Sequence, residues 1–64
     1  MTGAELTRAR KLMRLSIHQL GEALGFAGTR IQIKSRVHKL EAGQQRIPDD
    51  VAQRVMDMMG STVR

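Results

Sequence analysis

Apolar side chains recur along this chain at every third or fourth position, which is the spacing of amphipathic helices. Four stretches show it, and they are separated by short segments that contain Gly, Ser or Pro. The pattern predicts an all-α fold in which residues 1–64 form one small domain. The predicted helices cover residues 3–14, 17–24, 33–42 and 48–59.

The first two predicted helices begin at capping boxes. Thr2 precedes Glu5 by three positions, and Ser16 precedes Gln19 by the same interval. In each pair the hydroxyl can cap the helix while the longer side chain bonds back to the cap residue. Gly25 then marks the end of the second helix.

The third helix is predicted within KSRVHKLEAG, residues 34–43. Val37 and Leu40 are spaced to face a core, and Gly43 stands where a left-handed C-cap would end the helix. The other side carries hydrogen-bond donors, which suits the major groove of DNA. These donors are Lys34, Ser35, Arg36, His38 and Lys39.

The start of this helix is ambiguous in the sequence. Thr29 is able to cap a helix that begins at Arg30, or the helix begins near Ile33. We favour the later start, because the intervening IQI segment has no strong helical bias.

The fourth helix has an unusually wide apolar arc. Pro48 suits its first turn, two aspartates complement its dipole, and Gly60 is the expected stop. The apolar residues span roughly 160° of the helical wheel, which is wider than one packing seam requires. The surplus predicts a homodimer interface formed by Ala52, Met56 and Met59.

Composition and charge narrow the function. The chain has no Cys and only two His, so disulfides and metal sites are not expected. Its net charge of +5 favours a polyanionic partner. No acidic residue lies between Glu22 and Glu41. No stretch has the length of a membrane span or a signal-peptide core, so a cytoplasmic protein without membrane association is expected.

Catalytic motifs are missing from the sequence. There are no paired carboxylates in a plausible cleft, no Ser/His/acid set and no Gly-rich phosphate loop after a strand. We therefore expect no enzyme activity, no cofactor and no small-molecule ligand.

Three segments resemble the Cro/CI-type (XRE-like) helix-turn-helix family of lambda repressor-like domains. They are RAR at residues 8–10, LSIHQLGEALG at 15–25 and HKLEAGQQRIP at 38–48. The resemblance implies an ion pair between Arg10 and Glu41 that fixes the recognition helix.

The chain departs from the family in three ways. Ile17 replaces the usual Gln at the start of the second helix, so a thymine-methyl contact or plain packing is expected there in place of a hydrogen bond. Gly21 replaces the usual Ala where two helices cross. The interval from Gly25 to Glu41 is also longer than usual, so residues 26–32 either lengthen the turn or extend the recognition helix.

The resemblance also assigns contacts to double-stranded DNA. It implies base contacts by Lys34, Ser35, Arg36 and Lys39. Contacts with the DNA backbone are expected from Ile17, His18, Thr29, Arg30, His38, Gln44 and Arg46.

Together these features predict a transcriptional repressor that binds an inverted repeat as a homodimer, with autoregulation and nucleoid association in a bacterial host. RIPDDVAQRVMDMM, residues 46–59, is also similar to the short anti-CRISPR-associated regulators of phages, which implies a phage or mobile-element origin. Two alternatives stay open, namely an antitoxin and a basic RNA- or ribosome-associated protein.

Overall fold

A computed structural model describes the backbone of residues 1–63 and the side chains of residues 1–60. Within this part the chain forms four helices and no strand, which confirms the predicted all-α fold class. The helices are α1 (Gly3–Leu12), α2 (Ile17–Ala23), α3 (Arg30–Glu41) and α4 (Asp49–Val63).

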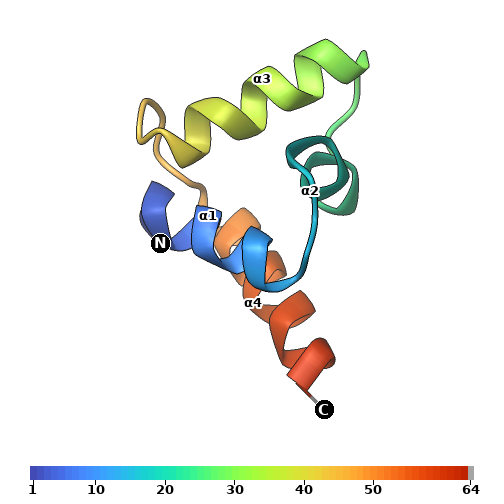
Figure 1. The fold of residues 1–64 in the computed structure, drawn as a ribbon. Coiled ribbons are helices and arrows are strands. Elements are labelled where there is room, and N and C mark those ends of the chain that lie inside the picture. The colour runs from blue at the N-terminus through green and yellow to red at the C-terminus, as the bar shows by residue number, and fades with distance from the viewer. Residues whose placement is uncertain (64) are drawn as a thin grey trace.

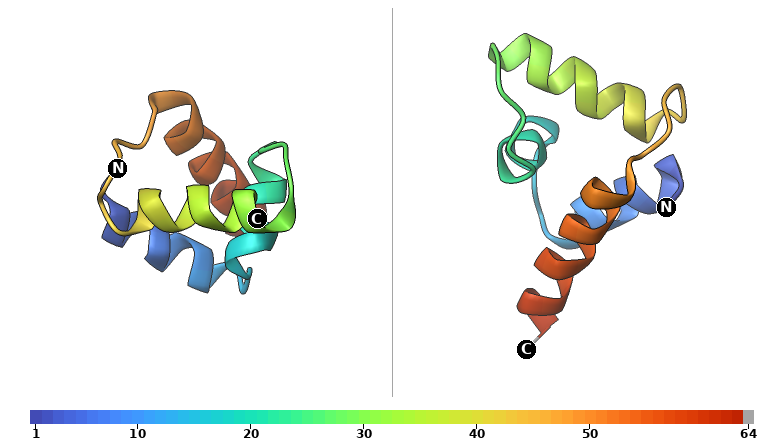
Figure 2. Two further views of the ribbon diagram at one scale, coloured as in Figure 1. Left: turned by 90° about the horizontal axis from the view of Figure 1, so that it is seen from above. Right: turned by 180° about the vertical axis from the view of Figure 1, so that it is seen from behind.

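The helices are arranged so that α3 lies along one end of the molecule. It rests on α1 and α2, while α4 packs beside α1 and leads away toward the opposite end (Figures 1 and 2). One long side of α3 therefore faces outward. None of the described helices is long and apolar enough to cross a membrane.

The core draws one fully buried side chain from each helix. Leu6, Leu20, Val37 and Val55 have no exposed area or almost none, and further apolar residues fill the space around them. No charged or polar side chain of the described part is buried among them. Packing of α3 against the rest thus depends on aliphatic contacts, which supply most of the stability in so small a domain.

Two glycines allow α3 to approach its neighbours closely. A Cβ added at Gly3 would collide with the backbone carbonyls of Leu40 and Glu41, so the first turn of α1 touches the last turn of α3. A Cβ at Gly21 would collide with the side chain of Ile33, where α2 crosses α3. The close approach of the two helices therefore requires a small residue at this crossing, as predicted, and Gly21 supplies it.

The predicted start of α3 near Ile33 was wrong, because the helix begins at Arg30. Thr29 accepts a hydrogen bond at Oγ1 from the backbone N–H of Gln32 (3.2 Å), and its own N–H donates to Gln32 Oε1 (2.9 Å). This third capping box outweighs the weak helical bias of IQI. Residues 26–32 thus both lengthen the turn and extend the helix.

Other helix ends also differ from the predictions. The first helix stops at Leu12, because Arg14 adopts a left-handed backbone conformation with φ of 58°. The fourth begins at Asp49, with the Pro48 carbonyl accepting the first helical bond from Ala52. It continues to Val63, so the predicted stop at Gly60 was also wrong.

The other predicted stops hold. Gly25 and Gly43 follow α2 and α3 with φ of 82° and 77°, the left-handed conformation expected of residues that end helices.

Candidate nucleic-acid interface

The outward side of α3 is basic and polar. Its inward side is fixed by Ile33, Val37 and Leu40, all buried. No carboxylate interrupts the exposed side, because Glu41 at the end of the helix is turned into an ion pair. The exposed residues of α3 are Arg30, Ile31, Gln32, Lys34, Ser35, Arg36, His38 and Lys39.

The C-terminal end of α3 is held to α1 by the pair of residues that the family resemblance implied. Arg10 Nε donates to Glu41 Oε2 at 2.8 Å, and Arg10 Nη2 donates to Oε1 at 3.2 Å. Thr7 Oγ1 also donates to Glu41 Oε1, while Arg10 Nη1 donates to the Leu15 carbonyl. The two charged side chains are only 14% and 9% exposed, so this network fixes the helix at that end.

The middle of α3 has a different anchor. The guanidinium of Arg36 lies over the ring of Phe26, 4.4 Å from its centroid. Phe26 is the only aromatic residue of the chain, and it is half-buried against the core. This cation–π contact ties α3 to the connection that precedes it and limits the directions in which Arg36 can extend.

The structure divides the four predicted base-contact residues. Lys34, Ser35 and Lys39 are exposed, and no hydrogen bond or ion pair is found for their side chains. Arg36 is exposed as well, but its guanidinium is already held by Phe26. All four belong to one helix, so the structure brings them together.

The predicted backbone-contact residues fall into two groups. Gln44 and Arg46 are exposed in the loop after α3, and Arg30 and His38 are exposed on α3 itself. The remaining three have other contacts: Ile17 packs against the core, His18 Nδ1 lies 3.1 Å from Glu22 Oε1, and Thr29 caps α3.

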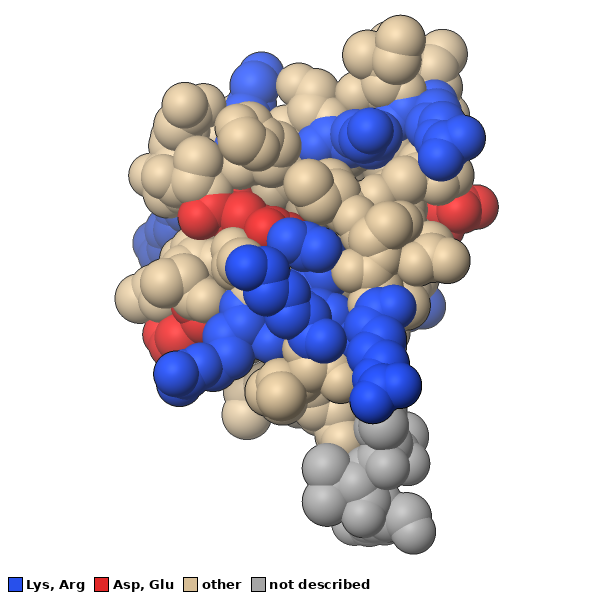
Figure 3. Space-filling model, viewed as in Figure 1, with Lys and Arg blue, Asp and Glu red and all other residues tan. Residues whose placement is uncertain are grey.

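Basic side chains extend beyond α3. Figure 3 shows Lys and Arg gathered along α3 and, below it, over α1. The exposed Lys and Arg residues of the first helix and its end are Arg8, Lys11 and Arg14. Positive charge thus covers two adjoining helices, whereas three of the six carboxylates of the chain, at Asp49, Asp50 and Asp57, belong to α4.

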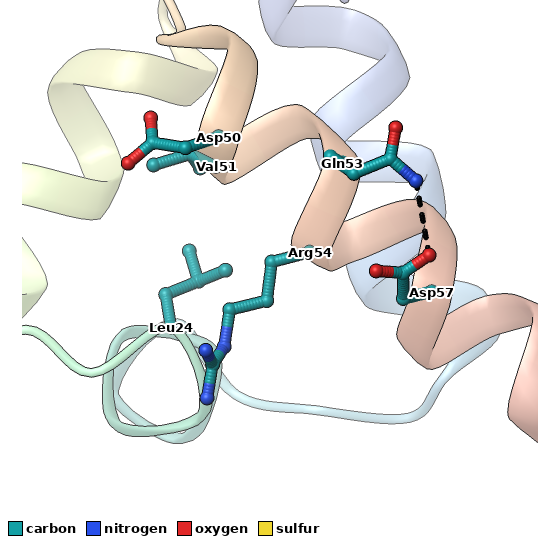
Figure 4. A pocket seen from close by; sticks show the side chains of 6 residues that line it. All are labelled: Leu24, Asp50, Val51, Gln53, Arg54 and Asp57. Carbon is teal, nitrogen blue, oxygen red and sulfur yellow. Dashed lines mark hydrogen bonds between the residues drawn. The ribbon is translucent and has the colours of Figure 1, made fainter.

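A shallow hollow lies between the end of α2 and α4 (Figure 4). Arg54 Nε donates to the Ala23 carbonyl at 3.1 Å, and Gln53 Nε2 donates to Asp57 Oδ1 at 3.0 Å. The first bond caps α2 and joins it to α4, so the polar groups here have structural roles. No cluster of potential metal ligands occurs among the described residues.

The residues predicted to form a dimer interface are unequally placed. Ala52 and Met59 are half-buried against the core, whereas Met56 is 59% exposed. Leu12 is 66% exposed and shares a shallow depression with Met59. The apolar surface of α4 therefore continues onto α1, an extension that the helical wheel of α4 alone does not reveal.

Two features of the exposed side of α3 were not predicted from the sequence. Phe26 was not recognised as the partner of Arg36, since this contact depends on how the connection after α2 folds. Ile31 was not considered, because the later start placed it outside the helix. The T-x-x-Q spacing of Thr29 and Gln32, the same signal that marks the two earlier helices, would have placed Ile31 on the helix.

Comparison of the chain with protein-family models, with curated proteins and with solved structures found no match in any of the three.

Proposed function

We propose that the chain is a sequence-specific DNA-binding protein that inserts α3 into the major groove and represses transcription. The observation that carries this proposal is the exposed side of α3, which has four Lys or Arg residues and no carboxylate. An α-helix fits the width of the major groove, where base edges present distinct patterns of donors and acceptors.

The side chains of α3 have chemistry suited to reading bases. Lys34, Arg36 and Lys39 can donate hydrogen bonds to the O6 and N7 acceptors of guanine. The hydroxyl of Ser35 can hydrogen-bond with several different bases. Phe26 holds Arg36 in place, which lowers the entropy lost when its guanidinium meets a base.

Residues at both ends of α3 would contact phosphates in this arrangement. Arg30 lies at its N-terminus, while Gln44 and Arg46 lie in the loop beyond its C-terminus. Contacts of this kind set the register of a protein on the duplex and make binding depend on salt.

A homodimer would present two copies of α3 to successive major grooves, about 34 Å apart, on an inverted repeat. We assign its interface to Ala52, Met56 and Met59, since α4 leads away from α3 and carries exposed apolar surface. Bound at the promoter of its own gene, in a phage or mobile element, the dimer would repress by excluding polymerase.

The test is selection of bound duplexes from a random-sequence library, followed by sequencing. We expect enrichment of an inverted repeat, and preference for DNA upstream of the gene over random duplex at physiological salt. Enrichment of no sequence would overturn the proposal. The deep, narrow major groove of A-form RNA does not admit α3, so a protein that binds through this helix should prefer duplex DNA. A structured RNA that displaces the enriched duplex at equal concentration would therefore favour the RNA-binding alternative.

A further inference from the structure

Ile31 is the most exposed large hydrophobic side chain that the structure describes, at 80% of its full area. It lies in the first turn of α3, two residues before Ile33, which is buried. The two isoleucines thus point to opposite sides of one helix turn, and only Ile33 contributes to the core.

Folding does not account for an isoleucine at position 31. β-branched residues are weaker helix formers than Ala, Lys or Gln, so Ile31 adds nothing to the helix that a polar residue would not add. Its neighbours on the exposed side are Arg30, Lys34 and Ser35. A single apolar group therefore stands within a basic and polar surface.

We propose that Ile31 packs against the C5-methyl group of a thymine in the major groove and is a determinant of sequence preference. The inference rests on the proposed function and deepens it. Thymine is the only base that presents a methyl group in this groove, and apolar side chains recognise it by contact. The flanking cations hold the helix at the DNA surface, where this contact buries the side chain.

The helix geometry fixes where this thymine lies. Lys34 and Ser35 follow Ile31 by three and four residues, which is about 4.5 to 6 Å along a helix axis. Base pairs are about 3.4 Å apart along the duplex. The thymine should therefore lie one or two base pairs from the base that Lys34 or Ser35 contacts.

The other apolar candidate for such a contact is less exposed. Ile17, at the start of α2, packs against the core and is partly buried, whereas Ile31 is 80% exposed. The methyl contact is therefore assigned to α3.

The experiment uses the duplex that selection enriches, with one thymine at a time replaced by uracil in a single half-site. Uracil keeps the Watson–Crick edge and lacks only the methyl group. At the thymine read by Ile31 we expect affinity to fall about threefold to fivefold, the value of one buried methyl. For Ile31→Ala the same replacement should have no effect, so the pair is coupled in a double-mutant cycle.

Two variants and one DNA control sharpen the result. Ile31→Val retains a branched apolar side chain and should stay sensitive to uracil. Lys34→Ala should bind more weakly but lose the same factor on uracil substitution. Uracil outside the enriched sequence should change nothing. Ile31→Ala should be at least as stable as the natural chain in thermal unfolding followed by circular dichroism, because Ala is the better helix former.

The outcomes separate this inference from the proposed function. Failure to enrich any sequence would remove the proposed function and the inference together. An enriched sequence that lacks thymine, or that binds the natural chain equally well with uracil at every position, would overturn the role of Ile31 and leave DNA binding intact.

Discussion

Arg10 and Glu41 are 31 positions apart in the chain, yet Arg10 Nε lies 2.8 Å from Glu41 Oε2 and joins α1 to the last turn of α3. Arg10→Met should destabilise the fold by about 3 kcal/mol, because it leaves a nearly buried carboxylate without its cation. Urea unfolding followed by circular dichroism measures the loss. The double variant Arg10→Met, Glu41→Leu should lose less than Arg10→Met alone, and equal losses would contradict this account.

Gly21 and Gly60 should respond oppositely to alanine. At Gly21 the new Cβ collides with Ile33, and we expect a loss of about 1–3 kcal/mol from overpacking. At Gly60, within α4, a Cβ meets nothing, so alanine should stabilise the helix by about 0.5–1 kcal/mol. Thermal melts of both variants test the pair. Stabilisation by Gly21→Ala would show that α2 and α3 are less closely packed.

The contact between Arg36 and Phe26 should affect DNA affinity. Arg36→Ala should weaken binding by about 1–3 kcal/mol if the residue reads a base. Phe26→Leu keeps an apolar side chain but removes the ring, and we expect a loss of about 0.5–1 kcal/mol. That second loss should vanish in the Arg36→Ala background, as fluorescence anisotropy of a labelled duplex would show. Additive losses would mean that Phe26 acts independently of Arg36.

The role of α4 in self-association can be tested at its most exposed methionine. Met56→Lys places a charge in the proposed interface and should convert a dimer into a monomer in sedimentation experiments at micromolar concentration. Gln45→Lys makes the same change of charge at an exposed residue outside the proposed interface, and it should leave the mass unchanged. A natural chain that is monomeric without DNA would refute the assignment of a preformed dimer.

The first capping box should make stability depend on pH. Hydrogen bonds from the backbone and hydroxyl of Thr2 lower the pKa of the Glu5 carboxyl below its ordinary value of 4.5. The stabilisation is thus complete above pH 4.5 and is lost as pH falls through the lowered pKa of the folded state. Glu5→Gln keeps the box without a titrating group, as Gln19 and Gln32 do in the other two boxes.

Urea midpoints of the natural chain and of Glu5→Gln, compared from neutral pH to pH 3, measure this contribution. The natural chain should lose more stability than Glu5→Gln over the acid part of this range. Parallel curves would show that the carboxylate of Glu5 adds nothing to the cap.

The fold was largely predictable because its determinants are local. Ser16 and Gln19 carry a complete capping signal within four residues, and Gly43 ends α3 as expected. The error at Arg30 came from giving the weak helical bias of Ile31 and its neighbours more weight than the same signal at Thr29. The predicted stop at Gly60 was wrong because this glycine does not have a positive φ, and a glycine without positive φ does not end a helix.

The candidate site was predictable only in part. Lys34 and its neighbours could be placed on one exposed side from periodicity, because burial of Val37 and Leu40 determines that side. The contact of Arg36 with Phe26 joins a helix to an irregular connection, and no periodic pattern encodes it. Predicting that Ile31 is exposed on α3 required knowing where the helix starts, and this start depends on two hydrogen bonds between Thr29 and Gln32.

The first turn of α3 lies ahead of Ile33, its first buried residue, and is closed by Thr29 and Gln32. Substitutions at Arg30 or Ile31 therefore change the chemistry of the exposed side without disturbing any core contact. Under the proposed function, stability and sequence preference would be set by different residues of the same helix. A lineage carrying this domain could therefore acquire new target sites through this one turn while the rest of the molecule stays as it is.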